Sequence, residues 1–162
     1  MHSKEFTKAF EYELQNRAFA LRAMFGIARR LHGDPQNDFW GGYARLERFN
    51  VPRYAEAAQR WGLDPQPQTW TRIRGTVIGA TPKFMLRSLL KFAYPKTVEY
   101  LEELRRMRGL GPDDGKAFLD YVVDQEVVQI EMMQLALNER YPEITRNLEA
   151  FFQKYSDKDL FD

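Results

Sequence analysis

Glycine and proline divide this chain into four long stretches of residues that favour helices. The motifs HGDP, GLDPQPQ and GLGPDDG interrupt it, and each combines the two residue types that most disfavour helix interiors. Ser3 precedes the first stretch and Asp38 the second, and both side chains are common helix N-caps. The predicted helices cover residues 4–31, 39–61, 82–108 and 114–140, and a short fifth helix follows YPE and reaches about residue 155. The chain is therefore predicted to be all-α.

The connections between these helices differ in length, and the lengths restrict how the helices can be arranged. Short links join the first two long helices and the last two, so each pair is expected to be an antiparallel hairpin. Residues 63–80 show no clear helical period and contain two prolines and two glycines, so an irregular crossing segment is expected there. The prediction is one domain over residues 1–162: an up-down four-helix bundle with one long crossover between helices 2 and 3 and a short C-terminal fifth helix.

The predicted fourth helix carries three acidic residues within an apolar sequence, FLDYVVDQEVVQIEMMQLAL. At about 100° per residue, Asp124 and Glu131 fall near the polar side of this helix. Glu126 lies in the middle of the apolar face, among Leu119, Val122, Val123, Ile130, Met133 and Leu137. In the second helix Glu47 occupies a similar apolar face, which also carries Trp40, Tyr43, Tyr54 and Trp61. Two carboxyl groups are therefore expected inside the bundle.

A neutral amide stands one helical turn after each inward glutamate: Asn50 in ERFN and Gln129 in EVVQ. The arrangement resembles the ferritin-like superfamily, whose di-iron members place Glu-x-x-His on the second and fourth helices and a single carboxylate on the first and third. The resemblance implies a site for iron or manganese formed by Glu47, Glu126 and, on the third helix, Glu99. Both histidines of that pattern are replaced by amides here, and the chain's two histidines lie near the ends of the first helix.

These inward carboxylates have two main interpretations, and a degenerate site that retains one weakly held ion lies between them. In the first, a metal-dependent oxidoreductase uses Glu47, Glu126 and Glu99 with altered ligands. In the second, which we favour, no cofactor is bound and a buried polar network compensates the carboxylates. The expected members of that network are Glu13, Arg17, Asn50, Tyr54 and Gln129. Glu13 is expected about 15 Å from the level of Glu47 along the bundle. The second interpretation implies a binding or structural role, in a homo-oligomer formed through a helix face.

A long segment of the chain is basic and contains no acid. Between Asp64 and Glu99 no acidic residue occurs, while six basic ones do: Arg72, Arg74, Lys83, Arg87, Lys91 and Lys96. Lys83, Arg87 and Lys91 recur at every fourth position. We expect apolar neighbours such as Phe84 and Leu90 to pack in the core while this stripe faces solvent or the acids of EYLEEL. The alternative is a peripheral membrane or lipid-binding surface over residues 72–96, since a basic amphipathic helix can lie at a membrane interface.

The overall composition argues against nucleic acid as a partner. The 24 lysines and arginines are balanced by 23 acids, which gives a formal net charge of +1. The chain contains no cysteine, and this excludes disulfides and thiolate metal ligands. Its N-terminus lacks the apolar run of a signal peptide, and no apolar run approaches the roughly 20 residues of a spanning helix. We therefore expect a cytoplasmic protein, with a membrane surface as the less favoured partner.

Overall fold

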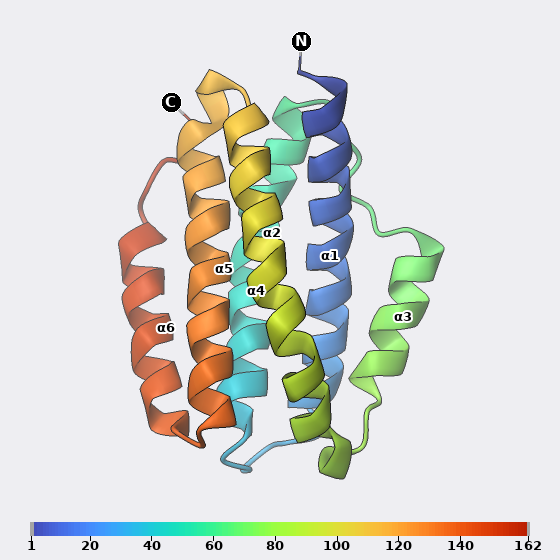
Figure 1. Ribbon diagram of the computed structural model, residues 1–162, viewed down its shortest axis with the longest axis vertical. Helices are drawn as coiled ribbons and strands as arrows, with labels where there is room; N and C mark the ends of the chain where they lie inside the picture. Colours follow the sequence, from blue (N-terminus) through green and yellow to red (C-terminus); the bar gives the residue numbers. More distant parts are fainter. Residues whose placement is uncertain (1, 162) are drawn as a thin grey trace.

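The computed structural model describes residues 2–161, and every regular element in that range is a helix (Figure 1). The all-α prediction is therefore confirmed. The elements are α1 (Lys4–Ala28), α2 (Asn37–Arg60), α3 (Thr69–Gly79), the 3-10 turn η1 (Lys83–Met85), α4 (Leu86–Leu110), the 3-10 turn η2 (Asp113–Gly115), α5 (Lys116–Leu137) and α6 (Tyr141–Tyr155).

The four long helices pack side by side around one core. Helix α1 contacts α2 and α4, and α5 contacts the same two helices from the other side. Figure 1 shows that α1 and α2 run in opposite directions, as do α4 and α5, while α2 and α4 run the same way. The connection from α2 to α4 therefore has to return along the length of the molecule, as predicted. The short α6 covers α2 and α5 on the side remote from α3.

The helix ends follow local chemistry in part. The Ser3 hydroxyl accepts a hydrogen bond from the Phe6 N–H at 3.1 Å, so the predicted cap of α1 is confirmed. The prediction for Asp38 is wrong, because α2 begins one residue earlier, at Asn37. Asp38 lies instead in the first turn of α2, where a carboxylate interacts favourably with the helix dipole. Pro95 lies inside α4, which continues past it.

The prediction of an irregular crossover is wrong, because residues 69–79 form helix α3. Its buried positions are Gly75 and Gly79, and Ile78 is half-buried against the core, so the side that packs on α1 consists largely of glycine and the usual period is hidden. The two backbones approach closely. A Cβ added to Gly26 of α1 would lie 3.0 Å from the Gly79 Cα. The Arg30 guanidinium also donates to the Gly79 carbonyl at 2.7 Å. Helix α3 is thus held on α1 by close backbone packing and by polar contacts.

Candidate functional site

A cluster of polar side chains is buried where the four long helices meet. Helix α1 contributes Glu13 and Arg17, which stand one turn apart and both face the core. The other members come from the remaining three long helices: Glu47, Asn50 and Tyr54 from α2, Tyr100 from α4, and Tyr121, Gln125, Glu126 and Gln129 from α5. Each glutamate has at most 1% of its surface exposed, so its charge has to be compensated inside the protein.

Arg17 lies at the centre of this cluster and contacts all three buried glutamates. Its Nη1 is 2.8 Å from Glu47 Oε1, its Nη2 is 3.5 Å from Glu126 Oε2, and its Nε is 3.1 Å from Glu13 Oε1. The last contact is an ion pair without hydrogen-bond geometry. A single guanidinium therefore bridges carboxylates from α1, α2 and α5.

Tyrosines and amides donate further hydrogen bonds to the buried glutamates. Tyr54 and Tyr100 donate hydrogen bonds to the two oxygens of Glu13, at 2.7 Å and 2.6 Å. Gln125 donates to Glu126 Oε2 at 3.1 Å. A second set of bonds joins the amides to one another: the Asn50 amide donates to Gln125 Oε1 at 3.2 Å, and the Tyr121 hydroxyl donates to Asn50 Oδ1. The cluster is thus a continuous network across the bundle.

The charges of the network are unequal, because one guanidinium faces three carboxylates. Burial raises the pKa of Glu47 to about 7 although Arg17 opposes this shift, and the same causes raise the pKa of Glu126 to about 7. Burial acts to lower the pKa of Arg17, but the three glutamates hold it well above its ordinary value. Near neutral pH the arginine is therefore charged, while Glu47 and Glu126 are partly protonated.

The arrangement does not fit a divalent metal. The space between the three carboxylates holds the Arg17 guanidinium, which is itself a cation. Within residues 2–161 no group of three or more histidine, aspartate or glutamate side chains is placed to hold a metal ion. Glu99, the predicted third-helix ligand, is exposed, and its neighbour Tyr100 points inward in its place. Asn50 hydrogen-bonds within the network, and Gln129 accepts from Arg17 Nη1 at 3.3 Å.

The predicted separation of Glu13 and Glu47 is wrong, since both contact the same guanidinium. The error lies in the position of the turn. Helix α1 ends at Ala28 and α2 begins at Asn37, so Glu47, ten residues into α2, is level with Ala18, ten residues before the end of α1. Glu13 is then five residues away, or about 7.5 Å at 1.5 Å per residue. The Arg17 side chain spans that gap.

The structure brings together Glu13, Arg17, Asn50, Tyr54 and Gln129, the five side chains predicted to form a network. Three further members, Tyr100, Tyr121 and Gln125, were not predicted from the sequence, although helical spacing marks each of them. Tyr100 stands four residues before Leu104, which is buried on the inner face of α4. Tyr121 and Gln125 stand eight and four residues before Gln129, so they share its face of α5.

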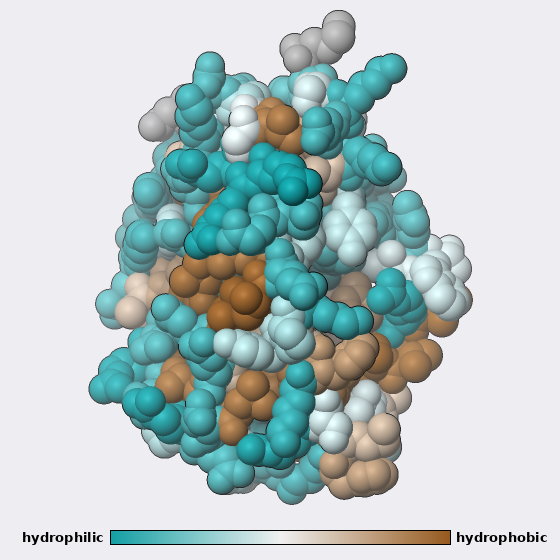
Figure 2. Space-filling view, in the orientation of Figure 1, coloured by the Kyte–Doolittle hydropathy of each residue, from teal (hydrophilic) through white to brown (hydrophobic). Residues whose placement is uncertain are grey.

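A second candidate site is the outer surface formed by α3, η1 and the first half of α4. Figure 2 shows apolar side chains gathered over this part of the molecule, at the lower right. The prediction that Phe84 packs in the core is wrong, since it is 83% exposed, whereas Leu90 is buried as predicted. Large apolar side chains exposed here are Trp70, Ile73, Val77, Phe84, Met85 and Phe92. Together with Arg72, Arg74, Lys83, Arg87, Lys91 and Lys96 we call them the basic–apolar surface.

The cations of the basic–apolar surface are only partly neutralised. Lys83 pairs with Asp34, and Arg87 lies 3.4 Å from Glu139. The other four, Arg72, Arg74, Lys91 and Lys96, form no ion pair with any acid in the described part of the chain. The acids of EYLEEL were expected to face this stripe, but Glu102 and Glu103 pair with arginines of their own helix. The surface therefore carries net positive charge.

None of the helices within residues 2–161 combines the length and the apolar character needed to cross a membrane. Comparison of the chain with protein-family models, with curated protein sequences and with solved structures found no match.

Proposed function

We propose that this protein binds peripherally to anionic membranes through the basic–apolar surface. The observation that carries the proposal is the coincidence of two features in one segment. Large apolar side chains are exposed there: Trp70 and Val77 are 65% exposed and Phe84 is 83% exposed. The same segment carries basic side chains and contains no acidic residue. An exposed apolar patch of this kind marks a site of interaction with another protein or with a membrane. The positive charge around the patch favours a negatively charged membrane.

The expected strength of this binding follows from the charges and the aromatic residues. A lysine or arginine close to an anionic lipid surface contributes about 1 kcal/mol, so the four unpaired cations supply about 4 kcal/mol, which salt weakens. Tryptophan and phenylalanine add the burial of apolar area at the level of the lipid headgroups. The combination predicts reversible binding that depends on ionic strength.

The proposal gives the buried network a structural role in a ferritin-like bundle whose metal ligands have been replaced. In support, Asn50 and Gln129 stand where the di-iron pattern has histidines, and Arg17 supplies the positive charge among the carboxylates. This arrangement offers no support for a metal-dependent oxidoreductase. The network would then hold the four helices in one register and present α3 and α4 as a rigid surface.

Cosedimentation with phospholipid vesicles tests the proposal. Binding is expected with phosphatidylglycerol in the vesicles, not with phosphatidylcholine alone, and is expected to weaken as salt is added. The double variant Arg72→Glu, Lys91→Glu should bind at least tenfold more weakly, because it reverses two unpaired cations. The variant Trp70→Ser, Ile73→Ser should also bind more weakly. As a control, Arg146→Glu reverses an exposed cation that pairs with Glu143 on α6, on the far side of the molecule, and should bind like the wild type.

Two results would overturn membrane binding. One is equal binding of the wild type and the Arg72→Glu, Lys91→Glu variant to anionic vesicles. The other combines two observations: the wild type does not bind vesicles, and it elutes from size exclusion as a dimer. In that case the Trp70→Ser, Ile73→Ser variant elutes as a monomer. The basic–apolar surface would then be a contact between copies of this chain.

A further inference from the structure

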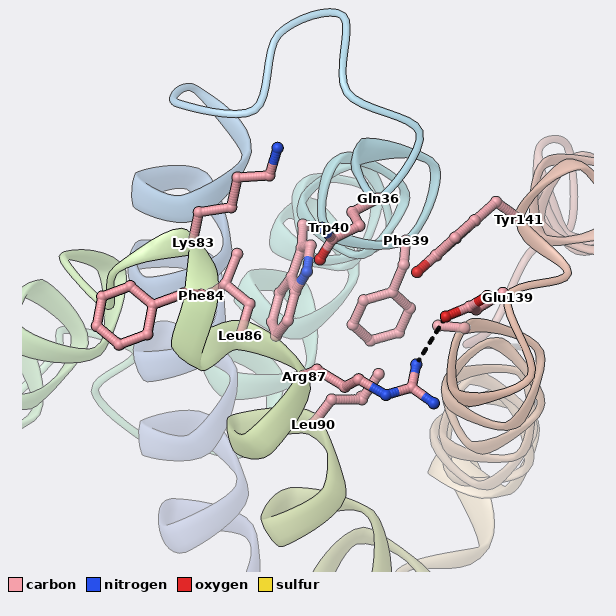
Figure 3. Close-up of a pocket in the computed structure, with 11 residues that line it drawn as sticks. Gln36, Phe39, Trp40, Lys83, Phe84, Leu86, Arg87, Leu90, Glu139 and Tyr141 are labelled. Atoms are coloured by element: carbon pink, nitrogen blue, oxygen red, sulfur yellow. Dashed lines mark hydrogen bonds and ion pairs between the residues drawn. The ribbon is translucent and has the colours of Figure 1, made fainter.

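A pocket of about 470 Å³ lies at the end of the bundle where α2 and α4 begin and α5 ends (Figure 3). Its volume is within the range of about 300 to 1,000 Å³ that is usual for small-molecule sites. The pocket is separate from the buried network, whose residues do not line it. It also joins parts of the chain that are distant in sequence, since Phe39, Leu86 and Ala136 all face it.

The inner wall of the pocket is apolar and rigid. It is formed by Phe39, Trp40, Leu86, Leu90 and Ala136, and each of these residues is at most 6% exposed. The rings of Phe39 and Trp40 pack edge to face, with centroids 4.8 Å apart, so that the aromatic part of the wall is fixed. A wall of this kind binds a hydrocarbon chain or ring by the hydrophobic effect.

Charged side chains lie at the rim of the pocket. Among the residues that line it, Lys83 and Arg87 are basic and Glu139 is acidic, and Lys83 also pairs with Asp34, which lies outside the lining. Arg87 is held in place from two sides: one nitrogen is 3.4 Å from Glu139 Oε1 (Figure 3), and another donates to the Leu137 carbonyl at 3.1 Å. The Glu139 side chain is 70% exposed, so it can turn toward solvent when an anion takes its place beside Arg87. The rim thus suits an anionic headgroup.

The pocket opens on the basic–apolar surface. Lys83, Phe84 and Arg87 belong to both: they line the pocket and also lie on the exposed face of η1 and early α4. We propose that the pocket binds the acyl chain of an anionic amphiphile, with its headgroup beside Lys83 and Arg87, and that the basic–apolar surface delivers this ligand from a membrane. The delivery step rests on the proposed membrane binding, whereas binding in the pocket requires only the pocket itself.

Titration calorimetry with dodecanoate below its micelle concentration tests the pocket without a membrane. One dodecanoate per chain is expected to bind, at least tenfold more tightly than hexanoate, because the longer chain covers more of the apolar wall. It should also bind more tightly than dodecyl maltoside, which has a hydrocarbon chain of similar length and a neutral headgroup. Ala136→Leu places a larger side chain in the pocket and should weaken dodecanoate binding at least tenfold while leaving vesicle binding unchanged. Leu90→Phe serves the same purpose if Ala136→Leu does not fold.

The results separate the two proposals. Absence of dodecanoate binding to a wild-type protein that binds anionic vesicles overturns the pocket and leaves the membrane proposal intact. Equal dodecanoate binding by the wild type and a folded pocket variant also overturns it. A third outcome is that the protein binds no vesicles but binds dodecanoate, and that Ala136→Leu abolishes this binding. That outcome supports the pocket and refutes delivery from a membrane. The ligand is then a free anionic amphiphile.

Discussion

Replacing Glu47 by glutamine is expected to stabilise the protein at alkaline pH. The Glu47→Gln side chain keeps nearly the same shape and can still accept a hydrogen bond from Arg17, which lies 2.8 Å from the native carboxylate. It removes one of three buried negative charges that share a single guanidinium. A buried ionic group is often less stabilising than a neutral replacement of the same volume, because its desolvation is costly. Here the excess of carboxylates adds to that cost.

The size of the effect follows from the raised pKa of Glu47. Burial raises this pKa from the ordinary value of 4.5 to about 7, so the folded protein binds the proton more tightly than the unfolded chain. This tighter proton binding adds to the stability of the folded protein. The contribution is fully present below about pH 4.5 and is lost as the pH rises through 7. A difference of 2.5 pKa units corresponds to about 3 kcal/mol, at about 1.4 kcal/mol per unit. Glu47→Gln should therefore be about 2 to 3 kcal/mol more stable than wild type at pH 8 and within about 1 kcal/mol of it at pH 5.

Urea unfolding at pH 5 and pH 8, followed by circular dichroism, measures both differences. Glu126→Gln should behave in the same way, because the pKa of Glu126 is also raised to about 7 by burial. Glu99→Gln is the matched control, since Glu99 is exposed, and it should change stability by less than about 0.5 kcal/mol at either pH. If Glu47→Gln is instead less stable than wild type at pH 8, the ion pair with Arg17 is net stabilising and the reasoning is wrong.

Three further predictions concern the network and α3. Arg17→Met should cost about 3 to 5 kcal/mol at pH 8, because it leaves three buried carboxylates without a cation, and less at pH 5; an equal cost at both pH values in urea unfolding would contradict this. Elemental analysis of protein from iron- and manganese-supplemented medium should find far less than one metal ion per chain; stoichiometric metal that Glu126→Ala removes would contradict the structural role. Gly26→Val should push α3 off α1 at a cost of about 1 to 3 kcal/mol and speed proteolysis in residues 61–68; unchanged cleavage would show that α3 accommodates the side chain.

The long helices could be predicted because they depend on local features of the sequence. Their apolar faces recur with the helical period, and proline with glycine ends them. Helix α3 could not be predicted in this way. Its buried positions are Gly75 and Gly79, and a glycine that permits close packing has the same sequence signature as one that breaks a helix. Only the position of α1, with Gly26 opposite Gly79, distinguishes the two cases.

Part of the buried site was also visible in the sequence. Helical phase separated Glu126 from Glu131, which is exposed, and identified Glu47 as its counterpart on α2. The same reasoning placed Asp124 in solvent, whereas α6 lies over it: Lys154 reaches its carboxylate at 2.6 Å, and Asp124 is only partly exposed. Helical phase gives the direction in which a side chain leaves its own helix, but it does not identify the neighbouring helix that packs in that direction.

The sequence alone determined an all-helical chain, two inward carboxylates on the second and last long helices, and a basic segment without acids. The tertiary structure decided that Arg17 reaches Glu13, Glu47 and Glu126 together, since this depends on the register of α1 against α2 and α5. It also decided that Phe84 is exposed and that a pocket lies beside it. Helical periodicity is a property of neighbouring residues, whereas compensation of a buried charge and exposure of an apolar side chain depend on which segments meet in space.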